Sequence, residues 1–103
     1  MKRVQAVIRP EKFDDVQEAL EAAGFAGFMV YDIRGHGTEG TPSGEYRGVA
    51  FTMSVRHKLL LDILVDDEEV EPVCAAIKAA ASEGKPGDGM IMLLDVAGVI
   101  PFR

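Results

Sequence analysis

The chain has 103 residues, 48% of them hydrophobic, and carries a formal net charge of −6 at pH 7. This length supports a single domain, residues 1–103, with a small but sufficient core. The excess of acidic residues argues against nucleic acid as a direct partner and against anionic membrane surfaces, because both attract clustered Lys and Arg.

The same sequence bears on the compartment. Residues 1–8 enter a strand pattern at once, so no signal peptide is expected. Apolar runs such as residues 91–94 are far too short to span a bilayer. Cys74 is the only cysteine, which excludes an intramolecular disulfide and fits a reducing environment. We therefore expect a cytoplasmic protein without direct membrane insertion.

The first expected elements are a strand over residues 2–8 and a helix after it. Apolar residues alternate along the strand and share one face: Val4, Ala6 and Ile8. Pro10 suits the first position of a helix, and Gly24 is typical of its C-terminal stop. Apolar residues recur at helical spacing between them and predict a buried stripe: Phe13, Val16, Leu20 and Ala23.

A second strand is expected over residues 25–33, apolar on both faces. Phe28 and Val30 share one face, and Met29, Tyr31 and Ile33 share the other. In so short a chain this pattern suggests that another subunit covers one face of the sheet. Residues 35–48 are polar and rich in glycine and proline, which predicts a long exposed loop. Loops of this length are often functional.

The second half repeats the alternation of strand and helix. A strand pattern begins at Val49, and its core continuation runs over residues 59–65. Asp66 and Glu69 predict a capping box. The helix after them has an apolar stripe: Val70, Val73, Cys74, Ile77 and Ala81. Pro72 is expected to confine the regular helix to later residues or to loosen its first turn. With a last strand over residues 90–96, the order predicts an α+β, ferredoxin-like βαββαβ fold.

The turn between the second helix and the last strand, residues 84–89, contains three glycines in six residues. Such a turn exposes backbone N–H groups, which suits an anion such as phosphate. Taken alone it is more often a plain connection, and it matches neither a Walker loop nor a dinucleotide fingerprint.

Enzyme chemistry has little support. His36 and His57 have no Cys or carboxylate nearby at metal-ligand spacing, and no nucleophile is paired with a base. The acidic run over residues 66–69 begins a helix, where carboxylates interact favourably with the helix dipole. We expect neither a catalytic centre nor a metal site.

Several features, in order and at matching spacing, make the chain resemble the PII signal-transduction family over essentially its whole length. They are Arg9-Pro10, Gly24, Gly27, Gly35, Gly37, Tyr46-Arg47-Gly48, Lys58, the turn from Gly84 to Gly89, and Asp95-Val96-Ala97. PII proteins are homotrimers that bind nucleotides in the cleft between subunits. The resemblance implies a nucleotide site made of Gly35 and Gly37 near the loop base, Asp62, Ile63 and Leu64 near the adenine, Gly87, Asp88 and Gly89 at the phosphates, and Arg103.

Departures from the PII pattern bear on the ligand. Basic residues expected near a triphosphate are replaced by Thr38, Met90 and Pro101, whereas Arg103 remains. Each charge-assisted hydrogen bond that is lost costs about 1.5–3 kcal/mol. Glu83, where a hydroxyl residue is usual, adds a carboxylate beside the phosphates. The sequence therefore predicts ADP or AMP in preference to ATP, and no permanent cofactor.

The second PII effector, 2-oxoglutarate, is held through Mg²⁺, ATP, a lysine matched by Lys58 and a glutamine replaced here by Glu39. Glu39 places a charge beside a doubly charged acid, so 2-oxoglutarate sensing is not expected. Tyr46 is retained in the loop, but Phe51 lacks the hydroxyl that is uridylylated in many relatives. Regulation by ligand, not by covalent modification, is expected.

The resemblance thus implies a regulatory homotrimer, not an enzyme, that engages a target through residues 36–55. The target would be a transporter, enzyme or regulator in nitrogen or carbon metabolism. Two alternatives keep the fold: a trimer that senses a metal, bicarbonate or another anion, and a scaffold for a transporter. An acyl-phosphate hydrolase on this fold is disfavoured, because it needs an Asn and the chain has none.

Overall fold

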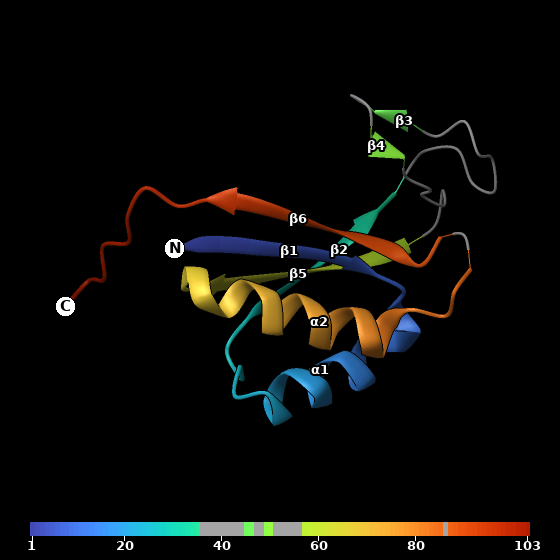
Figure 1. Cartoon of the computed structure of the whole chain (residues 1–103), viewed down its shortest axis with the longest axis horizontal. Helices are drawn as coiled ribbons and strands as arrows, with labels where there is room; N and C mark the ends of the chain where they lie inside the picture. The colour runs from blue at the N-terminus through green and yellow to red at the C-terminus, as the bar shows by residue number, and fades with distance from the viewer. Residues whose placement is uncertain (36–44, 47–48, 51–56, 86) are drawn as a thin grey trace.

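The computed structural model describes residues 1–35, 45–46, 49–50, 57–85 and 87–103. Four antiparallel strands form one sheet in the order β2-β5-β1-β6, and two helices lie on one side of it (Figure 1). The elements are β1 (Lys2–Ile8), α1 (Phe13–Ala22), β2 (Met29–Arg34), β5 (His57–Val65), α2 (Val70–Ala81) and β6 (Gly89–Asp95). This α+β arrangement agrees with the predicted ferredoxin-like fold.

The predicted loop over residues 36–55 lies mostly outside the described residues. Within it, β3 (Glu45–Tyr46) pairs with β4 (Val49–Ala50) in a separate two-stranded unit. The strand expected from Val49 falls partly on residues 51–56, which lie outside the described residues, and its described parts are β4 and the start of β5 at His57.

The core lies between the sheet and the helices. β1 is central, and its Val4 is level with Ile63 of β5 and Leu93 of β6. Buried apolar side chains of β1, β5, α1 and α2 form one cluster: Val4, Ala6, Ile8, Val16, Leu20, Leu61, Ile63, Val65, Val73, Ile77 and Ala81. The predicted stripe of α1 is confirmed for Val16 and Leu20, which are fully buried.

α1 ends in a hydrogen-bonded cap that explains two differences from the prediction. Gly24 has φ +93°, its N–H donates to the Glu21 carbonyl, and the N–H of Phe25 donates to the Leu20 carbonyl at 2.8 Å. This is the Schellman arrangement, and Gly24 is the predicted stop. Ala23 belongs to the cap and is exposed, so its place in the buried stripe was wrong.

The second strand begins at Met29, four residues later than predicted. Phe25 belongs to the helix cap, and both Phe25 and Phe28 pack against the core instead of pairing in the sheet. Phe28 meets Phe13 edge to face, with ring centroids 6.3 Å apart. Apolarity alone did not separate a strand from a packed connection.

The capping box before α2 is confirmed, since the N–H of Asp66 donates to Glu69 Oε1 at 2.8 Å. A 3-10 turn, Asp67–Glu69, precedes the α-helix, which begins at Val70. The regular helix is therefore not confined to residues after Pro72. Pro72 lies in the first helical turn, where its missing N–H removes no intrahelical bond.

The sheet face opposite the helices carries exposed apolar side chains. By the strand registers, alternate residues of β2, β5 and β6 share this open face. Its exposed apolar members are Met29, Tyr31, Leu64, Met92 and Leu94. The polar side chains of Arg3, Gln5 and Asp62 lie between them on the same face. Among the described helices, none has the length and apolarity to cross a bilayer.

Candidate functional site

The glycine turn after α2 is organised around the carboxylate of Asp88. Asp88 Oδ2 accepts hydrogen bonds from two groups just before the turn, Ser82 Oγ at 3.1 Å and the backbone N–H of Glu83 at 3.1 Å. It also accepts from the backbone N–H groups of Gly84 at 2.9 Å and Lys85 at 3.2 Å within the turn. Two N–H groups of the predicted turn, those of Gly84 and Lys85, therefore donate to a carboxylate of the chain itself instead of being exposed. Gly84, Gly87 and Gly89 have φ of +72°, +85° and +126°, so each uses glycine's freedom.

The charge on Asp88 is strongly favoured in the folded chain. Burial alone would raise the pKa of this carboxyl, but the hydrogen bonds from Arg9, from the backbone N–H groups of the turn and from Ser82 outweigh it. Together they lower the pKa of Asp88 to about 2. The carboxylate is therefore a fixed negative charge inside the turn at any physiological pH.

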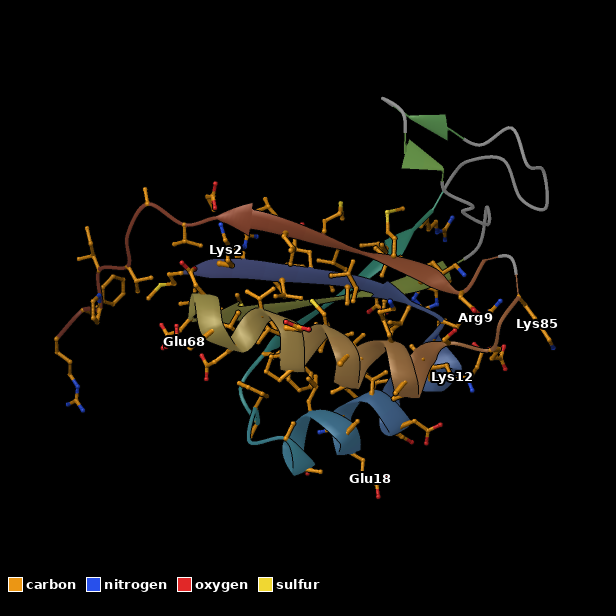
Figure 2. The ribbon with its side chains drawn as sticks, in the orientation of Figure 1. Lys2, Arg9, Lys12, Glu18, Glu68 and Lys85 are labelled. Carbon is orange, nitrogen blue, oxygen red and sulfur yellow. The ribbon has the colours of Figure 1, made fainter. Side chains whose placement is uncertain are left out.

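Two cationic side chains from the segment between β1 and α1 contact the same turn. Arg9, in the linker between β1 and the Pro10–Lys12 3-10 turn, donates from one guanidinium nitrogen to Asp88 and to Glu83 Oε1, the latter at 2.9 Å. Lys12 Nζ lies 3.6 Å from Glu83 Oε2. Figure 2 shows Arg9, Lys12 and Lys85 at the same end of the molecule. Arg9 and Lys12 are therefore paired with the carboxylates of Asp88 and Glu83, and Lys85 adds a further positive side chain within the turn.

Lys58 connects the turn to the base of the long loop. Its side chain is buried, and Nζ donates to the carbonyl of Gly87 at 2.9 Å. Lys58 is the second residue of β5, level with Ile33 of β2, and buried Gly35 follows the end of β2. Three predicted site regions, at Gly35, Lys58 and Gly87–Gly89, thus meet at one end of the sheet.

Asp62 is the most buried carboxylate among the described residues. It lies on the open face of β5, 3% exposed, and accepts hydrogen bonds from Arg3 Nη2 at 2.7 Å and from Gln5 Nε2 at 3.3 Å. The hydrogen bond from Arg3 lowers the pKa of Asp62, against the opposing effect of burial. Its carboxylate is therefore already engaged within this chain.

The residues predicted near the adenine lie farther along β5. The side chain of Ile63 is in the core, whereas Leu64 is 47% exposed on the open face. Pairing between β2 and β5 ends at Met29–Asp62, so beyond Asp62 the described strands flank β5 only on the β1 side. On the side away from β1, the backbone N–H and C=O groups of Ile63 and Leu64 therefore have no partner in the described strands and could hydrogen-bond a nucleotide base. Leu64 is five residues from Leu59, about 17 Å along the strand.

Arg103 lies far from the turn within one chain. β6 starts at Gly89 and ends at Asp95, and the C-terminal tail continues beyond that second end (Figure 1). The turn over residues 84–89 is at the other end of the same strand. A site that contains both Arg103 and the turn therefore needs a second copy of the chain.

The remaining predicted site residues belong to the loop over residues 36–55. Gly37 and Glu39 lie outside the described residues, and Tyr46 belongs to β3. Sequence reasoning missed Arg9 as a partner of the turn, because 79 residues separate it from Asp88 and no local pattern joins them. It also missed that His57 Nε2 lies 2.8 Å from Asp32 Oδ1, a pair formed across neighbouring strands at the loop base.

The family model and the curated relatives that match the chain carry the same description. A family model described as nitrogen regulatory protein P-II matches residues 1–103. Curated relatives include a nitrogen regulatory protein P-II of Nostoc punctiforme, 43% identical over 103 residues, and one of Pasteurella multocida, 39% identical; each alignment covers the whole chain and 92% of the relative. A nitrogen regulatory protein P-II 1 of Methanothermobacter thermautotrophicus is 38% identical over the whole chain and 90% of its own length.

Proposed function

The chain belongs to the nitrogen regulatory protein P-II family, and on that premise we propose that it is an adenine-nucleotide sensor acting on a partner protein. As a member of this family the chain is a regulatory signal transducer, not an enzyme. The proposed ligand is ADP or AMP in preference to ATP, bound at the Gly87–Gly89 turn. The partner is a transporter, enzyme or regulator of nitrogen or carbon metabolism, contacted through residues 36–55.

The observation that carries this proposal is the bond between Lys58 and the carbonyl of Gly87. It joins the turn directly to the strand in which the long loop ends. A buried, charge-assisted hydrogen bond of this kind is among the stronger polar contacts in a protein. A ligand that shifts the turn would therefore act on the start of β5, and through it on the segment that precedes β5.

The proposed assembly is a homotrimer. Two features support it: the exposed apolar side chains of the open sheet face, and the distance of Arg103 from the turn within one chain. Burying apolar surface contributes about 25 cal/mol per Å². Packing three open faces together would cover this patch and bring the tail of one copy towards the turn of another.

The preference for fewer phosphates is supported by the charges around the turn. Met90, directly after Gly89, is an uncharged residue where PII proteins carry a cation. Arg9 and Lys12 are both paired with Glu83, and Arg9 also with Asp88. A triphosphate would thus meet fewer compensating cations than it does in PII proteins, and ADP or AMP would be less affected.

Calorimetric titration of the purified protein with AMP, ADP and ATP, with and without Mg²⁺ and 2-oxoglutarate, tests the proposal. We expect micromolar binding of ADP or AMP and weaker binding of ATP. Tight ATP binding that 2-oxoglutarate strengthens would overturn the predicted ligand preference. If no adenine nucleotide bound at all, the nucleotide-sensing function itself would be refuted.

A further inference from the structure

Of the two described carboxylates at the turn, Asp88 accepts the hydrogen bonds that close it, whereas the side chain of Glu83 contacts cations from the segment after β1. This side chain accepts from Arg9 at 2.9 Å and lies 3.6 Å from the ammonium of Lys12. The hydrogen bonds that close the turn go instead to Asp88, and Glu83 contributes to them only through its backbone N–H. Replacing the Glu83 side chain therefore leaves those bonds in place.

The two cations that Glu83 engages are well placed to serve an anion at the turn. The side chains of Arg9 and Lys12 are only 16% and 22% exposed, so each is held close to the protein surface. The same Arg9 nitrogen bonds Asp88, which directly precedes Gly89. Positive charge beside the turn is thus shared between two carboxylates of the chain before any ligand arrives.

We propose that Glu83 is a specificity-determining residue that disfavours nucleoside triphosphates by competing with the terminal phosphate for Arg9 and Lys12. This inference rests on the proposed binding of adenine nucleotides at the turn. A nucleoside diphosphate has one negative charge fewer than a triphosphate and needs these cations less. Glu83 therefore acts on the selectivity between ligands more than on nucleotide binding as such.

The size of the effect follows from the added ligand charge. Two unit charges several Å apart interact strongly only where solvent is partly excluded, and exposed pairs are weakened by water and salt. The Glu83 side chain is 35% exposed, so the full interaction does not apply. We expect removal of its charge to shift the ATP-to-ADP affinity ratio about five- to tenfold towards ATP at low salt, and less at high salt.

The test uses Glu83→Gln, which keeps the shape and removes the charge. ADP and ATP are titrated into the wild type and the variant at two ionic strengths. Glu18→Gln is the matched control, because Glu18 is exposed on α1 and the substitution makes the same change in net charge (Figure 2). We expect the affinity ratio to shift in the Glu83→Gln protein only. Glu83→Asp, which retains the charge, should stay close to the wild-type ratio.

A second variant tests the competition directly. Lys12→Gln should reduce ATP affinity in the Glu83→Gln background. It should have little effect in the wild type, because there the ammonium of Lys12 is already paired with the Glu83 carboxylate. Such coupling distinguishes competition from a structural effect of Glu83.

The outcomes separate this inference from the proposed function. If ADP binds and Glu83→Gln leaves the affinity ratio unchanged, or Glu18→Gln shifts it equally, the inference is overturned and the proposed function stands. If neither form binds any adenine nucleotide, the proposed function falls, and the inference falls with it.

Discussion

The carboxylate of Asp88 accepts most of the hydrogen bonds described at the glycine turn. The sequence predicted a glycine turn with N–H groups suited to an anion, and those groups are present. Those of Gly84 and Lys85, together with the N–H of Glu83 just before the turn, donate to the chain's own carboxylate, so Asp88 has a structural role. Any phosphate at the turn binds beside this internal anion or replaces it.

Asp88→Asn tests that structural role through pH. Because the pKa of Asp88 is lowered to about 2 in the folded chain, the unfolded chain takes up a proton first as the pH falls. The stabilisation is therefore complete above about pH 4 and is lost as the pH falls towards 2. Allowing for partial solvent exposure, we expect the variant to be less stable by about 1–2 kcal/mol at pH 7.

Urea unfolding of both proteins at pH 7, 4 and 2.5 measures this difference, which should narrow at the lowest pH. Glu18→Gln is again the control. A gap that stayed constant from pH 7 to pH 2.5 would mean that the ionised carboxylate does not stabilise the turn.

For single residues, the sequence predicted which positions form the glycine turn but not which distant side chains contact them. Composition predicted a glycine turn over residues 84–89, and the resemblance to PII proteins, not composition, assigned Gly87, Asp88 and Gly89 to the phosphates. The ion pairs of Arg9 with the turn were not predicted, because they depend on how β1 and β6 pair. The burial of Asp62 beneath Arg3 likewise follows from the sheet register.

At the scale of elements, Gly89 joins the turn to the sheet by a close approach of two backbones. It is level with Ile8 of β1, and a Cβ at position 89 would lie 1.9 Å from the carbonyl oxygen of Val7. Its φ of +126° is also unsuited to other residues. Only glycine lets β6 begin at this point.

Gly89→Ala should therefore destabilise the protein by about 3 kcal/mol or more, since backbone must move to admit the methyl group. Gly84→Ala is the matched control: φ there is +72°, but a Cβ would meet nothing within 4 Å. It should cost about 1 kcal/mol. Denaturant unfolding of both variants measures the difference, and equal losses would argue against the close approach.

Element order was predictable, and element boundaries were less so. Helical spacing and the capping signals at Gly24, Asp66 and Glu69 predicted both helices. The start of the second strand was missed, because the sequence around Phe25 and Phe28 is as apolar as a strand but serves the cap and the core. Pairing, not apolarity, determines where a strand begins.

On the scale of the whole molecule, the residues of the proposed nucleotide site lie at both ends of the sheet of a single chain. The turn and Lys58 lie at one end of the sheet, while the tail with Arg103 leaves from the other. The sequence suggested a covered sheet face from the apolarity of residues 28–33. The exposed apolar side chains on the open face fit that suggestion.

Leu64→Asp tests the proposed assembly. Leu64 is 47% exposed on the open face, so a charge there should leave the fold intact but oppose burial against another copy. We expect the wild type to be a trimer and the variant to be mainly monomeric at micromolar concentration, by light scattering. Ala75→Asp, on the exposed side of α2, should remain trimeric. A trimeric Leu64→Asp protein would exclude the open face as the contact.

The central claim is that a nucleotide bound at the turn is sensed by the long loop. The most direct measurement is a titration of the isotope-labelled protein with ADP, followed by the amide resonances in nuclear magnetic resonance spectra. We predict that the resonances of Gly84, Gly87 and Gly89 shift together with those of residues 36–55, at one common affinity. Shifts confined to the turn, or none at all, would contradict the claim.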